Sequence, residues 1–210
     1  MSRVALLGDS IFDNAPYTAG GPAVIDHLRG VLPADWTADL LAIDGSVASD
    51  VPGQLNSLTG LHTHLVLSVG GNDALRRLDV LSTPVQSGGE ALALLAAAAA
   101  EFAADYRITV DSCLSFGMPL VVCTIYNGNF PEPEYQAAIR MALCAFNDVI
   151  IRTAMTRSLR VVELRAVCVS SEDYANPIEP SVLGGARIAR AIASALFTGV
   201  HTGPGARIAA

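Results

Sequence analysis

The stretch that decides the fold is Val4-Ala5-Leu6-Leu7-Gly8-Asp9-Ser10, an apolar run that ends in a glycine, an acid and a hydroxyl. Its apolar residues are continuous rather than alternating, which is typical of a parallel strand that is covered on both faces. Ligands of parallel α/β sheets bind at the carboxyl ends of the strands. The sequence therefore predicts a buried first strand whose far end carries functional side chains.

Further along the chain, four similar apolar runs alternate with helical patterns. The predicted strands are Asp39–Ile43, His64–Val69, Pro119–Ile125 and Arg160–Leu164. The predicted helices are Pro22–Leu32, Gly89–Phe116, Glu134–Arg157 and Ser181–Leu196. Strands that alternate with helices favour a doubly wound α/β fold with a five-stranded parallel sheet and right-handed crossovers.

Composition excludes several classes of function. The 210 residues predict one domain over 1–198, with a Gly-rich tail over 199–210. The net charge of −7 argues against binding to nucleic acid or to an anionic membrane, because both need a basic patch. The chain contains no lysine, which excludes a P-loop lysine, a Schiff base and a Ser-x-x-Lys acylation base.

The start of the chain, its longest apolar stretch and its cysteines indicate the cellular compartment. The first apolar run is too short for the core of a signal peptide, and the ten-residue apolar stretch Ala91–Ala100 reads as the interior of a helix rather than a membrane span. The four cysteines show no C-x-x-C spacing. We expect a cytoplasmic protein that does not insert into a membrane.

The strand ends carry a recognisable pattern. Gly8-Asp9-Ser10-Ile11 follows the first strand, Gly45 follows the second, and Gly70-Gly71-Asn72-Asp73 follows the third. This order resembles the SGNH (GDSL-type) hydrolase family, and the resemblance spans roughly residues 3 to 197. It implies a flavodoxin-like three-layer α/β/α sandwich and hydrolysis of esters. The Gly-x-Ser-x-Gly elbow of α/β-hydrolases and the G-x-G-x-x-G dinucleotide fingerprint are both missing.

The resemblance implies a role for each motif. Ser10 is the expected nucleophile, and the oxyanion hole is formed by the backbone N–H groups of Ser10 and Gly45 with the side chain of Asn72. Physical chemistry agrees, because acyl transfer needs an exposed hydroxyl and donors aimed at the developing oxyanion. A glycine lets a backbone N–H approach closely, and Asn72 supplies an uncharged donor.

The chain departs from the family where the general base is expected. The family carries an Asp-x-x-His pair before its last helix, but residues 171–185 contain no histidine. Two registers compete. If Asp173 is the family Asp, Asn176 takes the His position. If Pro180, Ser181 and Gly184 are matched instead, Glu179 takes the His position and Asn176 the Asp position.

We favour the second register, because it keeps the spacing to the final helix. A histidine base needs an acceptor on its other nitrogen, whereas a carboxylate base needs a donor, which an Asn at position 176 offers. The hypothesis is therefore a Ser10–Glu179 dyad assisted by Asn176. A free Glu has a pKa about two units below that of His, and burial against Tyr174, Pro177 or Ile178 raises it.

Other polar residues compete for a role. His62 and His64 form an H-x-H pair at the opposite end of the third strand, without a nearby acid or cysteine, and His201 lies in the tail, so no metal site is predicted. Candidate contacts in the substrate cleft are Asp9, Asp13, Asn14, Asp73 and Asp173. An acidic cluster there suits Mg²⁺ or Ca²⁺, but Asp residues after strand-end glycines more often bond turn backbone.

The sequence thus predicts a serine ester hydrolase that cleaves small acyl esters through an acyl-enzyme on Ser10, with Glu179 as the base. No cofactor is expected, and the partner is a small-molecule ester. The segment from Tyr126 to Pro131 is a candidate wall of an acyl or alcohol pocket. The alternative is a catalytically impaired binding protein that retains the cleft. The sequence makes no prediction of oligomeric state.

Overall fold

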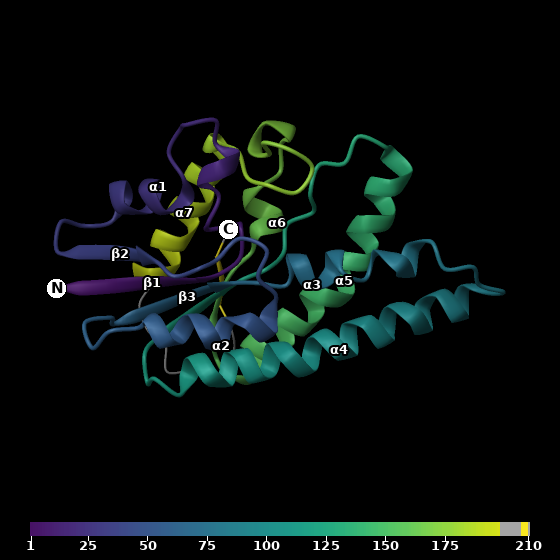
Figure 1. Ribbon diagram of the computed structural model, residues 1–210, viewed down its shortest axis with the longest axis horizontal. Helices are drawn as coiled ribbons and strands as arrows, with labels where there is room; N and C mark the ends of the chain where they lie inside the picture. Colours follow the sequence, from purple (N-terminus) through teal and green to yellow (C-terminus); the bar gives the residue numbers. More distant parts are fainter. Residues whose placement is uncertain (198–206, 210) are drawn as a thin grey trace.

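The computed structural model describes residues 1–197 and 207–209 of the chain. Its centre is a parallel sheet with the strand order β2-β1-β3-β4-β5-β6 (Figure 1). The strands are β1 (Ser2–Gly8), β2 (Trp36–Leu40), β3 (His64–Ser68), β4 (Leu120–Cys123), β5 (Arg160–Val162) and β6 (Arg207–Ala209). β1 pairs in parallel with β2 on one side and with β3 on the other, and the strand order changes direction between β1 and β3. The carboxyl ends of these strands therefore lie at one switch point.

Helices cover both faces of the sheet. The α-helices are α1 (Val24–Val31), α2 (Val51–Gln54), α3 (Gly71–Leu75), α4 (Gly88–Leu114), α5 (Pro133–Thr156), α6 (Leu164–Val167) and α7 (Val182–Phe197). Single 3₁₀ turns are η1 (Ala15–Tyr17), η2 (Ala48–Asp50), η3 (Leu55–Ser57), η4 (Leu78–Leu81) and η5 (Ser171–Asp173). None of the described helices is both long and apolar enough to span a membrane.

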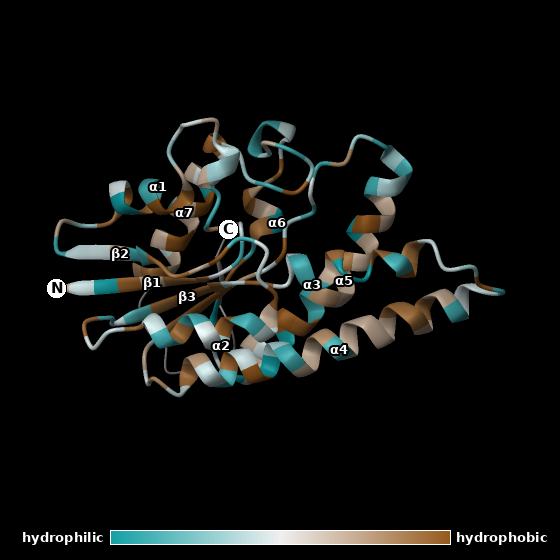
Figure 2. Cartoon of the chain, viewed as in Figure 1, coloured by the Kyte–Doolittle hydropathy of each residue, from teal (hydrophilic) through white to brown (hydrophobic). Residues whose placement is uncertain are grey.

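Alternation along β1 divides the core in two. Val4 and Leu6 pack into a cluster with α1, α6 and α7, whereas Ala5 and Leu7 pack on the other face with α2, α4 and α5. All four side chains are fully buried. The hydrophobic colour of Figure 2 accordingly runs along β1 and β3 in the middle of the molecule. This arrangement is the predicted three-layer α/β/α sandwich, with its sheet buried on both faces.

The structure confirms the five-stranded parallel sheet and extends it by one strand. β6 pairs in parallel with β5 and lies within the predicted tail, most of which is outside the described residues. β2 begins and ends earlier than predicted, because the apolar run that suggested Asp39–Ile43 continues past the end of the edge strand into the loop at Ala42. The four long helices lie within two residues of their predicted bounds.

Several helices extend past the sheet. Figure 1 shows α4 running beneath the strands and projecting beyond their carboxyl ends, where α3 and the start of α5 also lie. These segments provide walls for the region next to the strand ends, where the predicted nucleophile is located.

Candidate active site

A tight turn after β1 presents Ser10. Gly8 has φ of +130°, and a Cβ at this position would lie 1.7 Å from the carbonyl oxygen of Ser68. Only glycine therefore allows β1 and β3 to approach this closely. The turn is closed by Asp9, whose N–H donates to Ser68 O over 3.2 Å and whose Oδ1 accepts from the N–H of Ile11 over 3.1 Å. The backbone thus fixes Ser10 at the switch point.

Ser10 and Glu179 are in direct contact. The hydroxyl of Ser10 donates to Oε1 of Glu179 over 3.0 Å, and both side chains are buried. Glu179 comes from the loop between η5 and α7, 169 residues further along the chain. A hydroxyl within this distance of a carboxylate can transfer its proton as it attacks a carbonyl carbon.

Burial changes the acidity of Glu179. Only 4% of the residue is exposed, and loss of hydration raises the pKa of its carboxyl to about 7, while the hydrogen bond from Ser10 opposes the rise. Its second oxygen, Oε2, is buried and has no hydrogen-bond partner among the described residues. Glu179 therefore has the pKa of a base that works near neutral pH, in the range usual for histidine.

The prediction that Asn176 donates to the Glu179 carboxylate is wrong. Asn176 is exposed, and its Oδ1 accepts hydrogen bonds from the backbone N–H groups of Ile178 and Glu179, each over 2.9 Å. Two backbone donors converge on this side chain, so the oxygen must face them and the amide NH₂ points elsewhere. Asn176 is an Asx-turn residue that shapes the loop carrying Glu179.

The three donors of the predicted oxyanion hole surround the same turn. Gly45 has φ of +79°, and Asn72 lies in the first turn of α3 and lines the cavity next to Ser10. Asn72 Nδ2 donates to the carbonyl of Ser46 over 2.9 Å, which orients the amide and leaves its second N–H available. Within the described part of the chain, the N–H groups of Ser10 and Gly45 donate to no protein acceptor. The assignment of these three groups to an oxyanion hole stays a prediction.

Sequence reasoning missed Gln54, which ties two of these loops together. Its Oε1 accepts from the N–H of Gly8 over 2.8 Å, and its Nε2 donates to Gly8 O over 2.7 Å and to Ser46 Oγ over 3.2 Å. The side chain is buried in α2. The only signal in the sequence is a single amide between Val51 and Leu55, a pattern too common to predict this role.

Of the candidate cleft residues, Asp9 lines the cavity beside Ser10. Burial raises its pKa to about 8, with the neighbouring Glu179 charge adding to the effect. The other four bond protein backbone, as turn residues do. Asp13 accepts from Asp44 N, Asn14 from Val24 N, Asp73 from Ala48 N, and Asp173 from Val169 N and Ser170 N.

For Asn14 and Asp173 the prediction of a cleft contact is wrong. Both are fully buried, because each is enclosed by backbone groups that it bonds. Asn14 also donates to Pro180 O over 3.4 Å, and Asp173 forms an ion pair with Arg187. Both therefore support the loop of Glu179 from outside the cavity.

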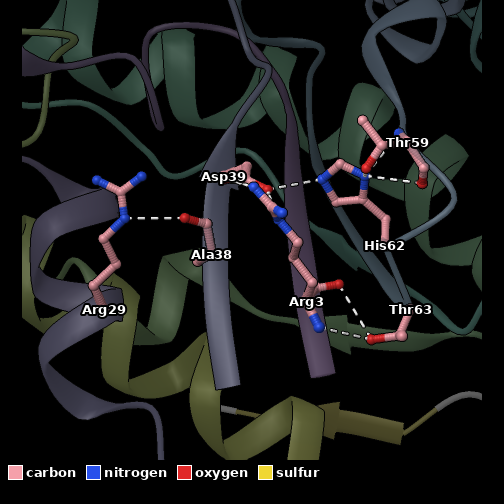
Figure 3. A network of polar contacts seen from close by, with 7 residues as sticks. All are labelled: Arg3, Arg29, Ala38, Asp39, Thr59, His62 and Thr63. Carbon is pink, nitrogen blue, oxygen red and sulfur yellow. Dashed lines mark hydrogen bonds and ion pairs between the residues drawn. The ribbon is translucent and has the colours of Figure 1, made fainter. Parts of the chain in front are cut away.

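His62 lies at the opposite end of the sheet, in a network of its own (Figure 3). Its Nε2 contacts Asp39 Oδ2 over 2.9 Å, its Nδ1 accepts from the N–H of Thr59 over 3.0 Å, and Asp39 also pairs with Arg3. Both ring nitrogens are engaged, so His62 is not available as a metal ligand. No cluster of three or more His, Cys, Asp or Glu suited to a metal occurs among the described residues, and His201 lies outside them.

A cavity opens from Ser10 and Glu179 toward the part of the molecule that extends beyond the sheet. It holds about 830 Å³ of empty space, including its open mouth. Its lining comes from α3, η4, α4, α5 and the segments at 125–130 and 178–179. Tyr126, Asn127, Gly128 and Phe130 are among these residues. The cavity thus connects the predicted nucleophile to an enclosed binding space.

The comparisons agree with this geometry. A family model described as the GDSL-like Lipase/Acylhydrolase family matches residues 6–184. A search of the curated proteins finds no match. Similar solved structures include an extracellular lipase from Streptomyces rimosus, with a TM-score of 0.65 at 18% identity, over 93% of this chain and 100% of that one.

Two further structures have the same fold. Phospholipase A1 from Streptomyces albidoflavus has a TM-score of 0.66 at 18% identity, over 93% of this chain and 98% of that one. Est24, a carbohydrate acetylesterase from Sinorhizobium meliloti, has a TM-score of 0.65 at 13% identity, with the same coverage. The family match covers most of the chain, including the Gly-Asp-Ser turn and Asn72. The chain belongs to the GDSL-like lipase/acylhydrolase family and is a carboxylic ester hydrolase.

Proposed function

We propose that this protein hydrolyses esters of small molecules through an acyl-enzyme on Ser10, with Glu179 as the general base. The observation that carries the proposal is the 3.0 Å hydrogen bond from the Ser10 hydroxyl to a buried carboxylate whose pKa is raised to about 7. A base with a pKa near the working pH combines a large deprotonated fraction with useful basicity.

In the acylation step, Ser10 Oγ attacks the carbonyl carbon of the ester while its proton moves to Glu179. The negative charge on the carbonyl oxygen is stabilised by the N–H groups of Ser10 and Gly45 and by the amide of Asn72. Collapse of the tetrahedral intermediate breaks the bond to the alcohol oxygen, which receives the proton from Glu179. The products of this step are the free alcohol and an ester of Ser10.

In the deacylation step, Glu179 removes a proton from a water molecule that attacks the acyl-enzyme. Breakdown of the second tetrahedral intermediate releases the carboxylic acid and returns the proton to Ser10 Oγ. The unpartnered Oε2 of Glu179 supports this role, because a carboxylate has a second oxygen with which to accept from water.

The test compares the wild type with Ser10→Ala, Glu179→Gln and Glu172→Gln on p-nitrophenyl butyrate. We expect Ser10→Ala to abolish turnover and Glu179→Gln to lower kcat by about 10²- to 10⁴-fold. Glu172→Gln changes an exposed acid in the preceding η5 turn and should match the wild type. Full activity in Glu179→Gln would refute the dyad. Background rates for the wild type between pH 5 and 9 would instead support a binding protein that retains the cleft.

A further inference from the structure

The cavity beside Ser10 is larger and more apolar than a short acyl group requires. Its lining extends from Ser10 to residues of α3, η4, α4 and α5, and its empty space of about 830 Å³ includes the open mouth. Beyond the polar groups near Ser10, side chains such as Leu78, Leu81, Leu95, Leu143 and Phe146 line it. Figure 2 shows hydrophobic colour along the stretch of α4 that extends past the sheet. An acetyl group would leave most of this surface in contact with water.

The positive charge in the cavity wall is already balanced by ion pairs. Arg77 also lines the cavity, but its guanidinium pairs with Glu101 and Asp79. An anionic ligand would therefore have to compete with two carboxylates for this side chain. The remaining lining away from Ser10 favours an uncharged hydrocarbon group.

The cavity has room for a chain of intermediate length. Its wall on α5 runs from Ile139 to Phe146, which corresponds to about 10 Å along the helix axis at a rise of about 1.5 Å per residue. A fully extended acyl chain of about eight carbons, a zigzag of single bonds of about 1.5 Å, spans roughly 9 Å and so fits within this length.

The position of Asn72 bears on which part of the ester, the acyl chain or the alcohol, occupies the cavity. Asn72, an expected oxyanion donor, belongs to α3, and the chain continues from α3 directly into the η4 wall that carries Leu78 and Leu81. Asn72 and Glu179 both line the cavity, and we place the acyl chain on the η4 side because the opposite substituent of the carbonyl carbon is the leaving oxygen. The leaving oxygen must instead face Glu179, which protonates it.

We propose that this cavity is an acyl pocket that selects esters of straight-chain acids of about eight carbons over acetates. The proposal rests on the proposed function, because it uses Ser10 and Asn72 to place the carbonyl group. It narrows the predicted class of small acyl esters to those with a medium-length apolar acyl chain.

The first experiment measures kcat/KM for p-nitrophenyl acetate, butyrate and octanoate. Each buried methylene contributes about fourfold (about 0.8 kcal/mol), so we expect octanoate to exceed acetate by at least about a hundredfold. Methyl, butyl and octyl acetates, which lengthen the alcohol instead, should show no such rise. Faster cleavage of acetate than of octanoate, or a rise confined to the alcohol series, would overturn the acyl pocket while leaving ester hydrolysis established.

The second experiment fills the pocket. Ala142→Phe adds a ring to the cavity wall on α5, and Ala137→Phe makes the same change at an exposed position of that helix. We expect Ala142→Phe to lower the octanoate-to-acetate ratio about tenfold and Ala137→Phe to leave it unchanged. If Ala142→Phe does not fold, Leu81→Trp, in the half-exposed wall of η4, makes the same test. A wild-type ratio in the folded variant overturns the pocket.

The third experiment does not depend on catalysis. 2-Nonanone is the methyl ketone with an octanoyl group and cannot be hydrolysed. We expect it to raise the Tm of the wild type and of Ser10→Ala, and to raise that of Ala142→Phe by less. Binding without turnover of any ester would refute the proposed function and support the pocket. Turnover without a Tm shift at saturating 2-nonanone would refute the pocket alone.

Discussion

The hydroxyl of Ser10 donates to Oε1 of Glu179 over 3.0 Å, so the side chain in contact with the predicted nucleophile is a buried carboxylate. A Glu at this place is effective only if its pKa approaches that of His. Burial provides this shift, because the pKa of Glu179 rises from 4.5 to about 7. The proposed use of Glu179 as the base, where the family resemblance implies a histidine, therefore has measurable consequences.

The first consequence concerns the pH dependence of activity. Only the ionised carboxylate accepts a proton, so kcat/KM should rise through a single limb near pH 7 and level off above it. The measurement is the rate of p-nitrophenyl butyrate hydrolysis from pH 4 to 9. A limb near pH 4.5 would show that burial does not perturb Glu179, and a limb that persists in Glu179→Gln would identify another base.

The second consequence concerns stability. Between pH 4.5 and 7 the folded state keeps the Glu179 proton that the unfolded state has lost, so the free energy of unfolding falls as pH rises through this window. Glu179→Gln removes this effect. We expect the free energy of unfolding of the variant to exceed that of the wild type by on the order of 2 kcal/mol at pH 8 and by much less at pH 4.5. The value at pH 8 is smaller than the full pKa shift would give, because the carboxyl borders an open cavity.

Urea unfolding at the two pH values measures this difference, with Glu172→Gln as the control for loss of an exposed acid. Asp9 also has a raised pKa of about 8, to which the neighbouring Glu179 charge contributes, so the difference between the wild type and Glu179→Gln includes the response of Asp9 to the loss of that charge. An equal stability of wild type and Glu179→Gln at pH 8 would contradict the buried-base interpretation.

The oxyanion hole makes a third prediction. Asn72→Ala removes the amide donor, and we expect kcat to fall about 10²- to 10³-fold with little change in KM, because the donor acts mainly on the transition state. Steady-state kinetics on p-nitrophenyl butyrate provides both values. A large rise in KM at constant kcat would mean that Asn72 binds the ground state instead. Asn129, whose backbone bonds Pro177, provides a control Asn→Ala substitution.

A fourth prediction uses two glycines. Gly8→Ala places a Cβ 1.7 Å from the Ser68 carbonyl oxygen, which is far inside van der Waals contact, so we expect loss of activity and a stability loss of several kcal/mol. Gly30→Ala in α1 meets no atom within 4 Å and should stabilise the protein by about 0.5–1 kcal/mol. Thermal unfolding of both variants measures the contrast, and equal effects would contradict it.

The network of Figure 3 makes a fifth prediction. His62→Ala leaves the Thr59 N–H without a partner and removes one partner of Asp39, which keeps its ion pair with Arg3, and we expect a loss of about 1–3 kcal/mol of stability. Because this network lies at the opposite end of the sheet from Ser10, kcat should not change. A drop in kcat at a temperature where the variant is fully folded would show that the two ends of the sheet are coupled.

Much of this fold was predictable because buried parallel strands are continuous apolar runs. The Val4–Leu7 run, the Gly-Asp-Ser turn and the Gly-Gly-Asn-Asp turn each carry a local signal, and these placed the sheet and the predicted nucleophile. The pairing of Ser10 with Glu179 depended on choosing one register in a loop without histidine, and the structure brings these two side chains together.

Other features depend on contacts that no local pattern encodes. Gln54 joins Gly8 and Ser46 across α2, and Asn176 turns its oxygen toward its own loop rather than its amide toward Glu179. The sequence showed which side chains are polar but not which neighbour each would bond. The same is true of the cavity, whose apolar lining comes from segments between Ile11 and Ile178, and whose helical part reads in the sequence as ordinary helix interior.

The walls of that cavity belong to α3, η4 and the projecting parts of α4 and α5, whereas Ser10 and Glu179 are held by the sheet and the loop before α7. Substitution, shortening or exchange of η4 and of the projecting parts of α4 and α5 should therefore leave Ser10 and Glu179 in place, whereas α3 also carries Asn72 and has to be kept. This separation allows one fold to change its substrate preference while it keeps the same reaction.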